Sequence, residues 1–254
     1  MYKRNLSILL FIALLVCCLP TATFVQSERV QITILGTTDL HGNIDPIDYY
    51  TNKPDNRGLA KIATLIKRLR KEQPNALLID SGDTIQGSPL ESFHGRKNNQ
   101  PPDPMMVVMN SLNYDAMTVG NHEYNFGLKV LEKARKEAKF PWLSANTYDV
   151  NTDKTHYAPY LIRNVAGVKI GILGLTTPGI PNWDNPPNYA GLEFHNPIPE
   201  ARKWVEVLRS KEKVDVVVIA MHMGLGEDLR TGEITPGQVP HENEAISIAK
   251  QVPG

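Results

Sequence analysis

This sequence has few cysteines, no excess of charge of either sign and no long apolar run. The 254-residue chain has two cysteines, Cys17 and Cys18, and both lie near the N-terminus. The rest of the chain therefore has no disulfide to stabilise it and no thiolate to bind a metal. Acidic and basic residues balance at 27 each, which argues against the basic surface of proteins that bind nucleic-acid polymers. A small anionic substrate would have to be bound by metals or by a few placed donors.

Residues 1–27 have the three-part layout of a secretory signal peptide. Lys3 and Arg4 precede a mainly apolar run over 6–19, and small residues follow it. The run is shorter than the roughly 20 apolar residues that a membrane-spanning helix needs. We interpret it as a leader cleaved after Ser27, which predicts an exported protein, periplasmic or secreted to the cell surface, with no stable membrane span. An uncleaved membrane anchor, or a lipoprotein acylated at one of the cysteines, stays open as an alternative.

Internal repeats and low-complexity segments are also absent from the sequence. Short β-branched apolar runs alternate with amphipathic stretches, and this alternation predicts an α/β domain. Strands are expected over 30–35, 76–79, 116–119, 142–145, 169–175 and 214–221, and helices over 58–72, 104–112, 128–138, 198–209 and 242–251. Two long loops, over 97–103 and 177–199, interrupt this alternation. Loops of that length border binding sites or are plain surface insertions.

Polar residues stand at the ends of four expected strands. Asp39 and His41 follow the first strand in Thr-Thr-Asp-Leu-His-Gly, and Asp83 follows the second in Asp-Ser-Gly-Asp. Asn121 follows the third in Gly-Asn-His-Glu, and His222 ends a later apolar run. Because the carboxyl ends of strands form the ligand crevice of an α/β sheet, these side chains are expected in one place.

Each of these fragments has an ordinary structural interpretation when taken alone. Asp-x-His can be a turn with an Asx cap, Gly-Asp can be turn chemistry, and a histidine ending an apolar strand can belong to the core. All of these interpretations would have to hold at equivalent positions at once, which favours a shared site. Gly82 and Gly120 support it, since glycine lets the backbone turn sharply and approach closely.

The residue types suit hydrolysis of a phosphate ester by two metals. Two divalent cations about 3.5–4 Å apart can stabilise the attacking and leaving oxygens and generate hydroxide at neutral pH. Such a pair needs a bridging carboxylate with imidazole and oxygen ligands on either side. Ligation by Asp, His and Asn without thiolate suits Mn²⁺, Zn²⁺, Fe or Co²⁺.

The order of the motifs resembles that of the calcineurin-like metallophosphoesterases. More narrowly, it is similar to the exported 5′-nucleotidase and 2′,3′-cyclic-nucleotide 2′-phosphodiesterase family. The likeness runs from about Val30 to the last residue and is most specific over 37–42, 80–89 and 120–127. It implies a four-layer α/β/β/α sandwich with mixed sheets, forming a catalytic domain over 28–254.

The resemblance also implies a role for each site residue. Five side chains would bind two divalent metals: Asp39 and His41 the first, Asp83 both, and Asn121 with His222 the second. His122 would be the catalytic histidine and would assist the leaving oxygen, while a metal-bound hydroxide attacks phosphorus in line. Asn121 and His122 would also contact the phosphate of a small-molecule nucleotide substrate.

Asn125 stands where the 5′-nucleotidases have the aspartate that orients the catalytic histidine. An amide can hydrogen-bond to His122, but it cannot stabilise an imidazolium by charge. Asn125 resembles the 2′,3′-cyclic-nucleotide 2′-phosphodiesterase/3′-nucleotidase branch, as do the stretches over 45–50 and 182–184. The predicted activity is therefore hydrolysis of 2′,3′-cyclic nucleotides and 3′-nucleotides.

The C-terminus departs from the family pattern. The family completes its metal site with a Gly-His-x-His-like segment after one further helix and strand, and then adds a domain that grips base and sugar. This sequence stops at Gly254, before both. We therefore expect a truncated catalytic domain in which each metal lacks one ligand.

Three other functions stay open at this point. A 5′-nucleotidase or nucleotide-sugar diphosphatase is favoured if Asn125 carries no specificity, and a thiosulfohydrolase-like dimanganese enzyme would use a similar site. A catalytically silent binding module is favoured if the native chain ends at Gly254. Glu123 either supports a neighbouring site residue or anchors a loop. The remaining histidines match no motif, so surface positions are expected for His94, His156 and His195, and a place beside a helix cap for His241.

Overall fold

Two sheets form the framework of the protein, whose computed structural model describes residues 29–235, 237 and 239–253. Both sheets belong to one compact unit, Gln31–Gly254. The first sheet has four parallel strands in the order β1 (Thr33–Thr37), β4 (Ala76–Asp80), β5 (Ala116–Thr118) and β6 (Trp142–Leu143). The second has the order β11 (Val216–His222), β9 (Val168–Thr176) and β8 (Tyr160–Val165). Because β9 runs parallel to β11 and antiparallel to β8, this sheet is mixed.

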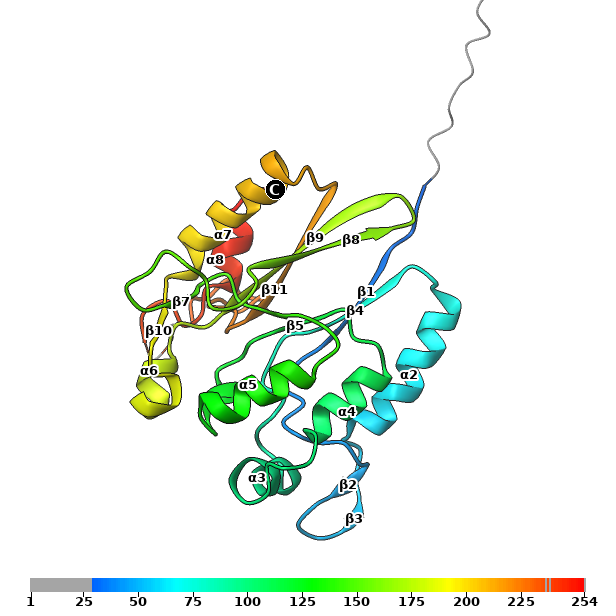
Figure 1. The fold of residues 1–254 in the computed structure, drawn as a ribbon. Coiled ribbons are helices and arrows are strands. Elements are labelled where there is room, and N and C mark those ends of the chain that lie inside the picture. The colour runs from blue at the N-terminus through cyan, green and yellow to red at the C-terminus, as the bar shows by residue number, and fades with distance from the viewer. Residues whose placement is uncertain (1–28, 236, 238, 254) are drawn as a thin grey trace, which may run out of the picture. The chain divides into compact units, whose positions relative to one another are not determined.

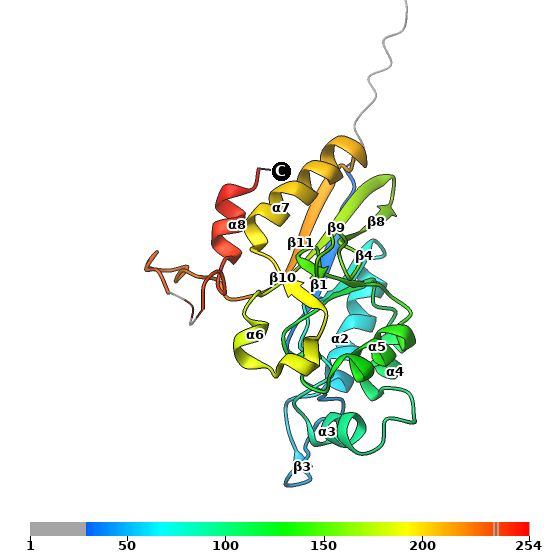
Figure 2. The same cartoon turned by 60° about the vertical axis from the view of Figure 1, so that its left-hand side comes forward.

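Helices cover the outer faces of the two sheets (Figure 1). On the first sheet lie α2 (Leu59–Glu72), α4 (Pro104–Ser111) and α5 (Leu128–Glu137), with α3 (Pro89–Arg96) beyond them. On the second lie α7 (Pro197–Glu206) and α8 (Ala245–Gln251), which run side by side in both views (Figure 2). Shorter elements complete the fold: β2 (Ile47–Asp48), β3 (Lys53–Pro54), η1 (His122–Tyr124), β7 (Thr147–Asp149), α6 (Ile180–Trp183), η2 (Pro186–Tyr189), β10 (Leu192–Phe194) and η3 (Val207–Lys211).

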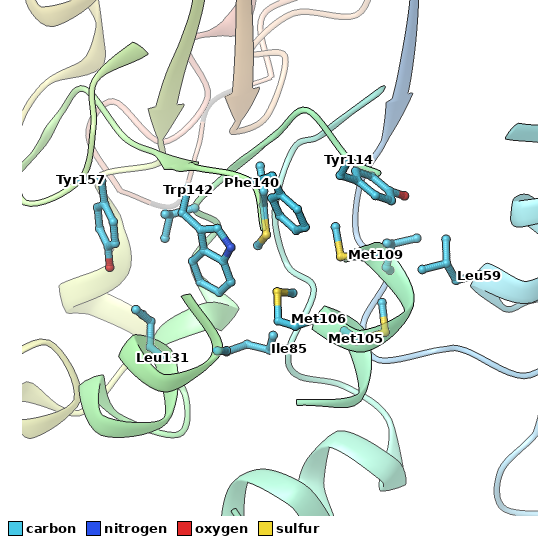
Figure 3. Packing of buried hydrophobic residues seen from close by; sticks show 14 of the residues in the cluster. Leu59, Ile85, Met105, Met106, Met109, Tyr114, Leu131, Phe140, Trp142 and Tyr157 are labelled. Carbon is cyan, nitrogen blue, oxygen red and sulfur yellow. The ribbon is translucent and has the colours of Figure 1, made fainter. Parts of the chain in front are cut away.

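Three apolar layers separate the sheets and helices. The layer between the first sheet and its helices is rich in methionine and aromatic residues, among them Met105, Met106, Met109, Phe140 and Trp142 (Figure 3). The layer between the two sheets contains Leu77, Ile79, Leu143, Ile170 and Ile172. The layer under α7 and α8 contains Leu173, Leu175, Val205, Leu208 and Ile248. Three apolar layers require four layers of secondary structure, so the predicted α/β/β/α sandwich is confirmed.

Local sequence explains where several of these elements begin. The side chain of Ser88 accepts a hydrogen bond from Glu91 N, and Pro89 occupies the first turn of α3. Asp103 caps α4 in the same way, by accepting from Met106 N, and Pro104 follows it. A capping oxygen followed by proline is a strong start signal, because it satisfies an otherwise unpaired N–H and presets the helical backbone.

The structure confirms every strand and helix expected from periodicity, with ends shifted by a few residues. Two other expectations were wrong. The segment over 177–199 is not an irregular loop, because it contains α6, η2 and β10, and β10 pairs with β7. His94 is not a surface residue: it lies on α3, is 4% exposed and hydrogen-bonds to Asn99. The loop over 97–103 is irregular, as expected.

The predicted leader over 1–27 lies outside the described residues. Within the part of the chain that the structure describes, no helix has the length and apolar character needed to cross a membrane.

Leu143 tests the layer between the sheets. Its side chain is fully buried, and it contacts Gly174 of the facing sheet so closely that a Cβ there would lie 2.5 Å from Leu143 Cβ. We expect Leu143→Ala to lower the free energy of unfolding by about 2–5 kcal/mol, because it leaves a cavity in a packed interior. The control is Leu65→Ala on α2, where the side chain is 44% exposed and the expected change is within about 0.5 kcal/mol. Equal effects in urea unfolding would contradict the assignment of this layer.

Candidate metal centre

The predicted site residues come together at the carboxyl ends of strands from both sheets. Asp39 and His41 lie just beyond β1, Asp83 beyond β4, and Asn121 beyond β5. His222 is the last residue of β11. The first sheet thus contributes four of these side chains, and the second sheet contributes one.

Asp83 lies at the middle of this group. Its carboxylate is 4% exposed, and its Oδ2 lies 3.2 Å from His222 Nε2 and 4.0 Å from His41 Nε2. His122 Nε2 is also 4.0 Å from this oxygen. One ligand atom each from Asp39, His41 and Asp83 lies within 4.8 Å of the others. Carboxylate oxygen and imidazole nitrogen at such spacing form a donor set that fits a divalent cation.

Asn121 and His222 form the other side of the group. His222 Nε2 lies 3.0 Å from Asn121 Oδ1, so the amide and the ring present their donor atoms to the same point as Asp83. A cavity of about 300 Å³ opens beside them, lined by Asp39, Asn121, Trp183 and His222 among others. The cavity gives a small ligand access to these side chains.

Two of the histidines are oriented by backbone carbonyls. His41 Nδ1 donates to Gln86 O at 3.0 Å, and His222 Nδ1 donates to Ser81 O at 2.8 Å. A carbonyl can only accept, so each neutral ring carries its proton on Nδ1 and leaves Nε2 free to bind a metal. Both Nε2 atoms face Asp83, as a metal ligand would require.

The electrostatics at Asp83 favour a cation. Burial alone would lower the pKa of His222, but the hydrogen bond and negative charge of Asp83 outweigh it and raise that pKa to about 9. For Asp83 the effect of burial alone would be to raise the pKa. Hydrogen bonding to His222 and the charge of that ring outweigh burial and hold the pKa of Asp83 below its usual value. The potential at this point therefore stabilises positive charge, which is what a divalent-metal site needs.

Three of the five predicted ligand positions have left-handed backbone conformations. The φ angles are 51° at Asp39, 47° at His41 and 60° at Asp83, a region that costs non-glycine residues of order 1–3 kcal/mol. Hydrogen bonds between the two loops hold this conformation: Asp39 N donates to Gly82 O and His41 N donates to Asp83 O, each at 2.9 Å. Strain that is maintained in this way is typical of functional sites.

Gly82 and Gly120 allow the loops of Asp83 and Asn121 to touch. A Cβ on Gly82 would lie 2.6 Å from Gly120 N, and a Cβ on Gly120 would lie 2.3 Å from Asp83 Oδ1. Any side chain at either position would push the loops apart, so Asp83 could not sit beside Asn121.

Glu123 ties the same two loops together. The residue is fully buried, and its Oε2 accepts hydrogen bonds from Asp83 N at 2.9 Å and Gly120 N at 2.7 Å. Its Oε1 accepts from Thr84 N at 2.6 Å and Ile85 N at 3.3 Å. Of the two roles left open by the sequence, these contacts support that of a loop anchor, and they also fix the position of Asp83.

His122 and Asn125 form the pair expected from their spacing in the sequence. His122 Nδ1 lies 2.6 Å from Asn125 Oδ1, while the His122 backbone N donates to Asp83 Oδ1 at 2.8 Å. One contact was missed by sequence reasoning: Asn125 Nδ2 donates to Asp184 Oδ2 at 3.0 Å. The only signal for it was the likeness of the stretch over 182–184 to one family branch.

Glu123 generates a prediction for stability. We expect Glu123→Gln to lower the free energy of unfolding by about 1–3 kcal/mol, because one amide oxygen cannot accept from all four N–H groups and a buried donor is left unpaired. Glu72→Gln, at the exposed end of α2, should change it by less than about 0.5 kcal/mol. Chemical unfolding of both variants measures the difference, and equal stabilities would show that the loops are held by other contacts.

Comparison with known proteins agrees with this geometry. The pattern of the family described as calcineurin-like phosphoesterase matches residues 32–247. A 2′,3′-cyclic-nucleotide 2′-phosphodiesterase/3′-nucleotidase of Yersinia enterocolitica is 36% identical over 100% of this chain and 39% of its own length. The protein of the same name from Salmonella typhimurium is 40% identical over 82% of this chain and 34% of its own length.

A solved structure supports the same relationship. The calcineurin-like phosphoesterase YfkN from Bacillus subtilis superposes with a TM-score of 0.77 and 32% identity, covering 87% of this chain and 69% of that one. This chain spans well under half the length of the Yersinia and Salmonella relatives. The matched residues include every proposed ligand, and the chain belongs to the calcineurin-like phosphoesterase family.

Proposed function

We propose that residues 28–254 are the catalytic domain of a divalent-metal-dependent phosphoester hydrolase that acts on nucleotides. The carrying observation is the buried Asp83 carboxylate, which has three imidazole Nε2 atoms within 4.0 Å at the edge of an open cavity. Family membership supports phosphoester chemistry. The names of the Yersinia and Salmonella relatives, together with Asn125, support 2′,3′-cyclic nucleotides and 3′-nucleotides as the favoured substrates.

Five side chains are proposed to hold two divalent metals. The first metal is assigned to Asp39 and His41, the second to Asn121 and His222, and Asp83 is assigned to both. When bound, two such cations supply Lewis acidity toward the phosphate and make water a stronger acid. Ligation by oxygen and imidazole is shared by Mn²⁺, Zn²⁺, Fe and Co²⁺, so the proposal covers any of them.

His122 is proposed to donate a proton to the leaving oxygen of the substrate. Its Nε2 faces Asp83 across 4.0 Å and its side chain is 39% exposed, so a phosphate bound at the centre would be within its reach. We assign to Nε2 the proton that the leaving oxygen takes as the ester bond breaks. Asn125 holds the ring through Nδ1, and the Asn121 amide is assigned a second contact with the phosphate.

Export of the chain is part of the same proposal. The pattern of basic, apolar and small residues over 1–27 supports a leader and a periplasmic or secreted protein. The balanced charge supports a small nucleotide as the partner, without binding to nucleic-acid polymers.

Metal content tests the assigned ligands. Protein dialysed against Mn²⁺ should bind two equivalents, and Asp83→Asn should lose both, because a neutral amide replaces the carboxylate shared by the two metals. Asp153→Asn, at an exposed position, should retain both. Elemental analysis measures the stoichiometry. The two-metal proposal fails if the wild-type protein binds no Mn²⁺, or if Asp83→Asn keeps two equivalents.

His122 is tested with a matched histidine substitution. His122→Asn should lower kcat by about 10²–10⁴-fold while metal content stays at two equivalents, because it removes the proton donor and leaves the ligands in place. His241→Asn, at an exposed histidine with a φ of 62°, should keep the wild-type rate, since Asn tolerates that conformation. The assay follows phosphate release from 2′,3′-cyclic AMP coupled to 3′-AMP hydrolysis. Faster turnover of 5′-AMP would instead assign the chain to the 5′-nucleotidase branch.

A further inference from the structure

The three histidines at the centre differ in what holds their Nδ1 atoms. His41 and His222 donate to backbone carbonyls, which have no alternative orientation. His122 is paired with the side-chain amide of Asn125 at 2.6 Å. An amide can rotate by half a turn and offer either its oxygen or its NH₂ group, so the carbonyl-like orientation needs a further partner.

Asp184 is that partner. Its Oδ2 accepts from Asn125 Nδ2 at 3.0 Å, and its Oδ1 accepts from Asn185 N and Asn188 Nδ2, each at 2.7 Å. An ionised carboxylate can only accept hydrogen bonds. Asn125 must therefore turn its NH₂ group toward Asp184 and its oxygen toward His122.

We propose that Asp184 is a positioning residue for His122, acting through Asn125 to select the ring tautomer. With Asn125 Oδ1 as an acceptor, His122 Nδ1 must donate, so the neutral ring carries its proton on Nδ1 and leaves Nε2 free toward Asp83. Asp184 also places a negative charge at the end of the chain His122–Asn125–Asp184. An aspartate at position 125 would place a negative charge directly beside His122. Here Asp184 supplies that charge from the far side of Asn125.

The selected tautomer matters for the proton transfer assigned above, and this part of the inference rests on the proposed function. A water oxygen forms the new bond to phosphorus and gives up a proton to solvent while the bond to the leaving oxygen breaks; the leaving oxygen keeps the electron pair of that bond and takes the proton from Nε2 of the imidazolium. The ring then returns to the neutral Nδ1–H form without any change at Asn125, and solvent restores the proton on Nε2. The opposite tautomer would require the Asn125 amide to rotate in every cycle.

The substitution Asp184→Asn separates this role from simple support of the loop. In this variant the backbone N of Asn185 still donates to the amide oxygen of residue 184. The NH₂ group of residue 184 therefore faces Asn125, where it meets the NH₂ group of Asn125. We expect the Asn125 amide to rotate and the proton of His122 to move from Nδ1 to Nε2. Nitrogen-15 NMR of the histidine rings in Zn²⁺-loaded protein at alkaline pH measures the tautomer, with His122 assigned from the spectrum of His122→Asn. We also expect kcat for 2′,3′-cyclic AMP to fall about 10–100-fold with a smaller change in KM.

A compensating pair of substitutions provides the rescue. Asn125→Asp alone places two carboxylates against each other and should lower kcat as well. Combined with Asp184→Asn, it should restore both the Nδ1–H tautomer and most of the rate, because a carboxylate at 125 accepts from His122 and from the new amide. The control is Asn182→Ala, which removes a hydrogen bond of α6 to Gly179 O without touching Asn125, and it should leave both readouts unchanged.

The outcomes are distinct. The proposal is overturned if Asp184→Asn keeps the Nδ1–H tautomer, or if its loss of rate matches that of Asn182→Ala. It is also overturned if the double variant, with wild-type thermal stability and metal content, recovers neither readout. If wild-type protein hydrolyses no nucleotide, the proposed function fails, and the NMR comparison still decides the role of Asp184.

Discussion

Four backbone N–H groups from two loops converge on one buried carboxylate, and the geometry of the centre depends on this convergence. Glu123 accepts from residues on both sides of the junction between Asp83 and Gly120. These bonds add to the two that join the loops of Asp39 and Asp83, and together they oppose relaxation of the left-handed backbone at Asp83. The two glycines permit the close approach, and Glu123 makes it favourable, because buried N–H groups are costly to leave unpaired.

A second constraint is the common orientation of the rings. All three imidazoles point Nε2 at Asp83 and use Nδ1 for an oxygen supplied by the protein. His41 and His222, the two histidines proposed as metal ligands, donate to backbone carbonyls, whose positions are fixed by the fold. His122 uses a side chain, and a side chain needs its own support. The segment over 177–199 supplies that support through Asp184, which lies between α6 and η2.

The sequence predicts the strands and the polar residues at their ends, because periodicity and strand-end position are local properties. The same reasoning misses α3, whose eight residues include few apolar positions, and β8, whose pairing depends on β9. It also leaves the role of Glu123 undecided, because three of its four donors lie about 40 residues earlier in the chain and converge only in the fold. The contact between Asp184 and Asn125 was missed for the same reason, because the two residues lie 59 positions apart in the chain.

His222 is the single proposed ligand from the second sheet, and its ring donates to the Ser81 carbonyl of the first. The centre therefore spans the joint between two halves of the sandwich. An ion held there would act as a crosslink between them, binding the folded arrangement and not the separated sheets. By mass action, such an ion at a hundredfold excess over its Kd would add about 2.7 kcal/mol to the free energy of unfolding. The stability of the packing between β9, β11 and the first sheet would then depend on the metal concentration.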